Sequence, residues 1–384
     1  MGGDFSSLRT RVLGFIEGQR LAPAGAGRYR YSTAVAASTL YSSTYAVMTR
    51  SLFGDLATLG QEEKAAWVAF LLSHQDDDGL FRDPAIFGEG WYEGDPLWCG
   101  RPHLSCHVIA ALACLGAFAP KHFRFLDPFT DPDALVRWLE ERDWAERVGW
   151  TGNEIMNIGT LLQYARDFHG DPRAGKAVAA LFEWLESHHL DPRTGVWGSL
   201  DVTQPVPRSH AVQAAYHWWP LFVYDGRPIP FVDQAIDTVL ATANPRGGFG
   251  WGVHNPSEPF DSSACEDIDS IFPLAVFLGA SLHRSEEVRK ALAVAADWIM
   301  TNQTTDGGFL FYKGKEFTYG HPALHGPAGV GAMFPTWFRS LSLAYIGKAL
   351  VRHPLAGEEW TFVRCPGVQF WGAGKPPAHL EEES

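Results

Sequence analysis

The chain alternates between two kinds of apolar segment. Segments of the first kind carry an apolar stripe at helical spacing with charged residues opposite, which predicts amphipathic helices on the outside of the molecule. These are expected over 5–20, 61–74, 131–142, 174–188, 230–243 and 285–302. Segments of the second kind consist of small and apolar residues on every side, with a few polar residues among them. They predict buried helices over 32–52, 103–117, 153–168, 208–223, 264–282 and 333–352.

A loop rich in glycine and aromatic residues joins the two helices of a pair. In the block Gln75…Gly79…Phe81, glycine follows glutamine by four positions and phenylalanine follows it by six, and Gln303…Gly307…Phe309 repeats this spacing. Glycine supplies the positive φ needed just past a helix. The aromatic ring is expected to pack back on its helix, and the glutamine to bond backbone groups of a neighbouring repeat. The repeat period of about 50 residues is typical of solenoids and toroids.

Six helical hairpins side by side can close into a ring. We therefore predict an all-α protein, an (α/α)6 toroid whose inner helices line a central cavity, because no alternating strand pattern of useful length is present. The barrel domain is expected over 1–364 and a tail over 365–384, disordered at its end from about Gly374. Long loops at 95–101 and 313–331 are expected to be functional lids or mouths.

Composition narrows the class of protein. The 384 residues are 46% hydrophobic and carry a net charge of −13, which makes nucleic acid an unsuitable partner. The N-terminus lacks a basic region followed by an apolar one, and no uninterrupted apolar run is long enough to span a membrane. Five cysteines form no CxxC pair, so a reduced, cytoplasmic protein is expected. The 15 Trp, 25 Phe and 11 Tyr predict an aromatic core, an aromatic pocket, or both.

The main candidate for chemistry is the acidic stretch that leads into the buried helix 264–282. Glu266, Asp267 and Asp269 fall within four positions. Carboxylates this close cannot all ionise freely once they are desolvated, so at least one should hold its proton more tightly than an isolated Asp. Such a group is a carboxylic acid available near neutral pH. The alternative is an acidic first turn that the helix dipole stabilises.

Other polar residues lie on the predicted inner helices. His210, Gln213 and His217 recur at i, i+3 and i+7, which predicts one stripe that faces the same cavity as Asp269. Arg339 needs a partner if it is buried, and an acid of the 266–269 stretch or a substrate anion would serve. His107 is the weaker candidate, because a lone histidine is more often a core residue. The remaining candidates for the cavity wall are Tyr45, Glu154 and Trp337.

The two glutamine–glycine–phenylalanine blocks resemble the repeats of squalene–hopene cyclases and of prenyltransferase β-subunits, in the terpenoid cyclase and protein prenyltransferase superfamily. That resemblance implies a toroid of six helical hairpins. Class II terpene cyclases carry an Asp-x-Asp-Asp motif, and Asp267-Ile268-Asp269-Ser270 is similar to it. The resemblance implies Asp269 as proton donor and Asp267 as its support, with Ser270 in place of the last Asp and Glu266 as a substitute. Protein prenyltransferases bind zinc through Asp-x-Cys and a distant His, and the corresponding stretch here, Asp267-Ile268-Asp269, has Asp at the Cys position, so no metal site is expected.

These observations favour an enzyme that protonates an alkene of a prenyl or terpenoid substrate in an aromatic-lined cavity. No cofactor is required, and Mg²⁺ would enter only if the substrate carried a diphosphate. One alternative is a carbohydrate-active toroid, a hydrolase, lyase or epimerase, in which Glu154 and Asp269 form the carboxylate pair. The other is a non-catalytic toroid that binds a lipid or a protein. The expected ligand is a small apolar molecule, and peripheral membrane contact and the oligomeric state are left open.

Overall fold

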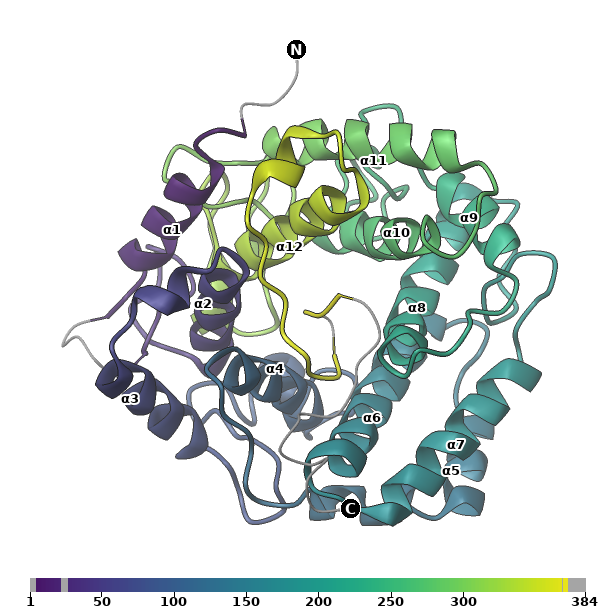
Figure 1. The fold of residues 1–384 in the computed structure, drawn as a ribbon, viewed down its shortest axis with the longest axis horizontal. Coiled ribbons are helices and arrows are strands. Elements are labelled where there is room, and N and C mark those ends of the chain that lie inside the picture. The colour runs from purple at the N-terminus through teal and green to yellow at the C-terminus, as the bar shows by residue number, and fades with distance from the viewer. Residues whose placement is uncertain (1–4, 22–26, 368, 372–384) are drawn as a thin grey trace.

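A computed structural model describes residues 5–21, 27–367 and 369–371. Within these ranges the chain folds into two concentric rings of α-helices (Figure 1). The outer ring contains α1 (Leu8–Gly18), α3 (Gln61–Leu72), α5 (Pro132–Glu140), α7 (Pro172–Ser187), α9 (Val232–Leu240) and α11 (Ser285–Met300). The inner ring contains α2 (Leu40–Leu52), α4 (Arg101–Cys114), α6 (Val148–Phe168), α8 (Pro205–Tyr224), α10 (Ala264–Phe277) and α12 (Met333–Ala349).

Short elements decorate the loops between the helices. One antiparallel hairpin pairs β1 (Phe317–Thr318) with β2 (His325–Gly326). The 3-10 turns are η1 (Asp55–Thr58), η2 (Gly90–Tyr92), η3 (Arg124–Phe129), η4 (Pro322–Leu324) and η5 (Pro354–Gly357). Each inner helix packs against the next, from α2 through α4, α6, α8, α10 and α12, and α12 packs back against α2. The ring is therefore closed, and the predicted (α/α)6 toroid is confirmed.

The two kinds of apolar segment separate as predicted. Every residue of α2 is buried, including its serines and threonines, because other helices surround it. In contrast, α5 buries only Leu135 and Leu139, four positions apart on one face. A helix that buries one stripe belongs on the surface, and one that is buried all round belongs inside.

The glycine–aromatic loops lock neighbouring hairpins together. Gln75 donates from Nε2 to the carbonyl of Gly79 at 2.9 Å and to that of Lys121, in the next repeat, at 3.0 Å. Gly79 has φ +90°, and a Cβ there would stand 2.3 Å from the carbonyl oxygen of His122. Only glycine fits both the backbone conformation and this close approach. The predicted role of the glutamine is confirmed at this loop.

Two inner helices begin elsewhere than predicted. Helix α2 begins at Leu40 rather than near residue 32, because the Thr39 side chain caps it by accepting from the Ser42 N–H. The Leu40 N–H donates to the buried carboxylate of Asp83 at 2.6 Å, which fixes the same end. Helix α6 begins earlier than predicted, at Val148.

The structure extends the barrel beyond residue 364. Cys365, Gln369 and Phe370 are each 2% exposed and pack against the inner helices. The disordered end expected from about Gly374 lies outside the described residues. No described helix is both long enough and apolar enough to cross a membrane.

Candidate active site

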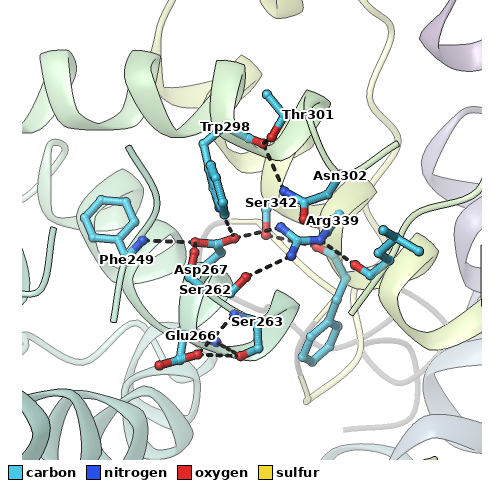
Figure 2. Close-up of polar contacts among 12 residues, drawn as sticks. Phe249, Ser262, Ser263, Glu266, Asp267, Trp298, Thr301, Asn302, Arg339 and Ser342 are labelled. Atoms are coloured by element: carbon cyan, nitrogen blue, oxygen red, sulfur yellow. Dashed lines mark hydrogen bonds and ion pairs between the residues drawn. The ribbon is translucent and has the colours of Figure 1, made fainter. Parts of the chain in front are cut away.

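Asp267 forms a buried ion pair at the start of α10 (Figure 2). Its Oδ2 accepts from the Arg339 guanidinium at 2.7 Å and from the Trp298 indole at 3.1 Å. Its Oδ1 accepts from the Ser262 hydroxyl at 2.8 Å and from the Phe249 N–H at 3.0 Å. Four donors satisfy both oxygens, and both charged side chains are 0% exposed. Burial raises the pKa of Asp267, whereas Arg339 and the other donors oppose this rise, and we assign Asp267 as the carboxylate of the ion pair because all of its contacts are donors.

Arg339 is the anchor of this network. Besides Asp267, it donates to the carbonyls of Leu310, Phe311 and Ser262 at 2.8, 2.9 and 3.1 Å. These carbonyls belong to the segments that precede α10 and α12, so one side chain of α12 fixes both segments against α10. A buried Arg339 was expected to need a charged partner, and in the structure that partner is Asp267.

Glu266 closes the N-terminus of α10. Its carboxylate accepts from the Ser263 N–H at 3.0 Å while the Ser263 hydroxyl accepts from the Glu266 N–H, which is a capping box. It also accepts from the Val253 N–H at 2.9 Å, and His254 lies 3.7 Å away. Burial alone would raise its pKa, but the bonds from His254 and from these N–H groups lower the pKa of Glu266 below its usual value. It is a fixed anion.

Asp269 lies one turn further along α10, in a different environment. It is 3% exposed, and its Oδ2 has no hydrogen-bond partner among the described residues. Burial, the negative charge of Glu266 and that of Asp267 together raise the pKa of Asp269 well above its usual value. It borders a cavity of about 10 Å³, room for roughly one water molecule. The buried hydroxyl of Tyr216 also has no described partner, and burial, with smaller electrostatic effects of Tyr345 and Asp269, raises the pKa of Tyr216 well above its usual value. Burial and the neighbouring negative charges thus favour the protonated, neutral form of Asp269.

The polar stripe of α8 lies close to these acids. Gln213 approaches the His254 ring at 3.4 Å, and the other nitrogen of His254 bonds the Ser263 hydroxyl at 2.9 Å. His210 is close enough to Glu266 and His254 for both to affect its pKa. One turn deeper, burial lowers the pKa of His217 to about 4, so its imidazole is neutral. His210 and Gln213 thus lie near the start of α10, but the α8 residues that line the small cavity beside Asp269 are Ser209 and Val212, not the predicted stripe.

Aromatic side chains form the opposite wall, on α2, α4 and α12. Tyr45 stacks on Trp337 at 5.1 Å between ring centroids, and the His107 ring lies 5.4 Å from each. The Tyr41 hydroxyl is hydrogen-bonded to His103 Nδ1 at 2.7 Å, and burial lowers the pKa of His103 to about 3. The Nε2 of His107 is buried without a described partner. Both imidazoles are neutral polar groups in an aromatic wall.

The segment between α11 and α12 covers the end of the ring at which the inner helices begin. A lid or mouth was predicted in this segment. Its Tyr319 stacks on Phe334 at 4.7 Å and lies 5.7 Å from Tyr41. Phe311 and Phe317 stack at 3.7 Å beside them. In this closed arrangement aromatic rings occupy much of the space between the walls. A substrate of any size must displace part of this segment.

Sequence analysis did not predict a cluster of tryptophans outside this lid. Trp91 and Trp150 are 39% and 41% exposed, and Trp98 lies between them at 5.4 and 4.2 Å. Trp91 also lies 5.6 Å from Tyr319, so the cluster continues the aromatic path from the lid to the surface. Trp91 and Trp98 lie in the long segment before α4. The tryptophan content of this segment was the sequence signal that could have identified them.

Two acidic features of the sequence lie away from this site. The Glu154 carboxylate accepts from Arg142, beyond the end of α5, at 3.1 Å. The structure thus corrects the expectation that Glu154 faces the cavity, because its helix turns this position towards the outer ring. The run 76–78 is held by Arg101, Arg82 and Lys121 in a turn, which agrees with a structural role. In the described part of the chain, no three His, Cys, Asp or Glu side chains are grouped closely enough to hold a metal ion.

Comparison with solved structures supports the fold assignment. No family model and no curated protein sequence matches the chain. The unsaturated glucuronyl hydrolase from Bacillus sp. GL1 superposes with a TM-score of 0.50 at 11% identity, over 88% of this chain and 96% of its own. A glycosyl hydrolase family 88 protein from Bacteroides vulgatus gives 0.50 at 10% identity, over 89% and 98%. A type II terpene cyclase from Scytonema gives 0.46 at 14% identity, over 89% and 95%. The likeness to the two hydrolases supports the (α/α)6 toroid fold and leaves the substrate open.

Proposed function

We propose that this protein is an enzyme that starts carbocation chemistry by protonating an alkene of a prenyl or terpenoid substrate. The observation that carries the proposal is the contrast within one helix turn. Asp267 and Glu266 have their oxygens bonded by donors, whereas Asp269 is buried with Oδ2 unpartnered. Of the three carboxyl groups, it alone combines a proton at neutral pH with an oxygen that is available to a substrate.

The reaction needs the Asp269 O–H and a cation-tolerant enclosure. The alkene π pair forms the new C–H bond with the Asp269 proton, the O–H bond breaks, and a carboxylate and a carbocation remain. The carboxylate, together with the nearby Glu266 anion, attracts the cation. The faces of Tyr45, Trp337 and Phe334 can stabilise it by cation–π contacts. Loss of a proton from the cation to Asp269 or to water gives a new alkene, so the step requires no cofactor.

The neutral histidines suit this chemistry. A charged imidazolium in the wall would repel a carbocation, whereas the imidazoles of His103 and His217 are kept neutral because burial lowers their pKa. Burial of the lid aromatics excludes water, which would otherwise capture the cation. The wall thus combines low polarity with a few neutral polar atoms.

A carbohydrate-active enzyme is the second candidate. The half-exposed tryptophan cluster and the polar stripe of His210 and Gln213 at the start of α10 are features that could stack on and hydrogen-bond a sugar. Its weakness is that Glu154, the second acid of the expected carboxylate pair, is bonded to Arg142. Two carboxyl groups that flank the scissile bond are the usual requirement for glycoside hydrolysis.

The test is turnover of a substrate panel by the wild type and by Asp269→Asn. Prenyl alcohols, prenyl diphosphates with and without Mg²⁺, prenylated phenols and unsaturated oligosaccharides are incubated with the protein, and products are identified by mass spectrometry. We expect cyclised or isomerised prenyl products, lost by a factor of about a hundred or more in Asp269→Asn. The control Asp133→Asn makes the same change at an exposed position of α5.

Two outcomes would overturn the proposal. A folded Asp269→Asn protein with near-wild-type turnover would leave the buried acid as a structural feature of α10. Turnover confined to oligosaccharides would establish the carbohydrate-active alternative. An unchanged melting curve for the variant ensures that lost activity is not lost folding.

A further inference from the structure

We propose that the described residues 365–367 and 369–371 after α12 (the C-terminal segment) form the floor of the reaction chamber, and that Gln369 and Phe370 set the length of hydrocarbon that the chamber accepts. The inference rests on the proposed function and adds to it a specificity-determining element. In Figure 1 the yellow segment after α12 turns back across the end of the ring. Neither residue belongs to a helix, and the repeat pattern gives no indication of their position.

Gln369 reaches deep into the ring. Its Nε2 donates to the carbonyl of Met48 in α2 at 2.8 Å, and its Oε1 accepts from the indole N–H of Trp337 in α12 at 2.5 Å. Trp337 is the ring that stacks on Tyr45 in the aromatic wall. A side chain of the tail is therefore bonded directly to the wall of the proposed chamber.

Phe370 spans the gap between α8 and α10. Its ring lies 5.9 Å from Tyr224 and 6.4 Å from Phe272 between centroids, and Phe272 lies 6.0 Å from Tyr216. Tyr216 is close enough to Asp269 for the charge of that acid to affect the pKa of Tyr216. Phe370 therefore supports Phe272 from below, and Phe272 in turn contacts Tyr216 near the acid.

The segment reaches every inner helix. Besides these contacts with α2, α8, α10 and α12, Gln369 Nε2 lies 3.8 Å from the Cys114 sulfur of α4. A Cβ on Gly367 would lie 3.9 Å from Thr160 of α6. A segment that meets all six helices near the axis closes the ring from its C-terminal end, opposite the lid.

A floor limits length because protein interiors are densely packed. A hydrocarbon whose reacting alkene lies at Asp269 must fit the remainder of its chain between that acid and the nearest atoms below. Removing the Phe370 ring takes away the support of Phe272, which can then move down and lengthen the space below Asp269 without a change at the acid itself. The preferred substrate should then become longer, while the chemistry of protonation is unchanged.

The experiment compares geraniol, farnesol and geranylgeraniol as substrates and as ligands. Turnover gives kcat/KM for each alcohol, and the rise in melting temperature reports binding even without turnover. The variants are Phe370→Ala, Gln369→Ala and the milder Phe370→Leu, which guards against loss of folding. The control is Trp371→Ala, which removes a larger ring at the rim, 36% exposed.

For each protein we divide kcat/KM for the alcohol one isoprene unit longer than the wild type's best substrate by kcat/KM for that best substrate. We expect Phe370→Ala to raise this ratio by about tenfold or more. The melting-temperature shifts should follow the same order, and Trp371→Ala should keep the wild-type order. An unchanged order of chain lengths in folded Phe370→Ala and Phe370→Leu would overturn the floor and leave prenyl turnover standing. Absence of both binding and turnover of every prenyl substrate would overturn the proposed function and the floor with it.

Discussion

The proton on Asp269 can be tested without knowing the substrate. If folding raises the pKa of this carboxyl group, then the stability of the protein must depend on pH through it. The perturbation is Asp269→Asn, which keeps the shape of the side chain and removes its titration. The quantity of interest is the free energy of unfolding of the wild type minus that of the variant, as a function of pH.

The magnitude follows from linkage. An unfolded Asp has a pKa of about 3.9, and above it the unfolded chain has released a proton that the folded protein still holds. The raised folded pKa means that the contribution of this group to stability is complete below the unfolded pKa and is lost as pH rises towards the folded one. The difference should therefore fall by about 1.4 kcal/mol for each pH unit above about pH 4, until the folded pKa is reached.

Urea unfolding followed by far-UV circular dichroism, recorded at several values between about pH 5 and about pH 8, gives this difference. The same curves for Asp133→Asn, the same substitution at an exposed position of α5, provide the control. A flat difference for Asp269→Asn would show that Asp269 is ionised in the folded protein. The acid proposed to start the reaction would then be absent.

Three further predictions concern the framework. Arg339→Met should destabilise the protein by about 3 to 5 kcal/mol in urea unfolding, because it leaves the buried Asp267 charge unpaired, and Asp267→Asn in the same chain should restore part of the loss. Gly79→Ala should lower the free energy of unfolding by roughly 2 to 5 kcal/mol, and the matched Gly88→Ala by about 1 to 2 kcal/mol. Both glycines have positive φ, but only at Gly79 would the added Cβ meet a backbone atom. Equal losses would refute this account. Glu154→Gln should reduce activity less than threefold and lower the free energy of unfolding by about 1 kcal/mol or less, as expected for a partly exposed ion pair. A loss of activity comparable to that of Asp269→Asn would instead support the hypothesis that Glu154 and Asp269 act as a pair of catalytic carboxyl groups.

The fold could be predicted because its determinants are local. Whether a helix is apolar on one stripe or all round decides which ring it joins, and this is visible in α5 and α2 from sequence alone. The glutamine–glycine–phenylalanine spacing is also largely local, since the positive φ of Gly79 and the bond from Gln75 to the Gly79 carbonyl both belong to one turn. Helix starts were less predictable. The start of α2 depends partly on the remote carboxylate of Asp83.

The candidate site was predictable only in part. The sequence indicated that the acids at 266–269 would compete for protons, but it could not assign the three roles. Those roles depend on donors from distant segments, such as Trp298 and Arg339 for Asp267. Glu154 shows the opposite case, in which helical spacing suggested a cavity residue and one arginine from the outer ring decided otherwise.

The sequence by itself determined the number of hairpins, their order and which helices are buried, because helix periodicity and turn chemistry act over a few residues. Tertiary structure decided which carboxyl group keeps its proton, since only the three-dimensional arrangement surrounds Asp267 with four donors and leaves Asp269 Oδ2 without one. It also decided that Gln369 is hydrogen-bonded to both Met48 of α2 and Trp337 of α12. Desolvation and long-range hydrogen bonds depend on which segments meet in space, and that information becomes available only when the ring has closed.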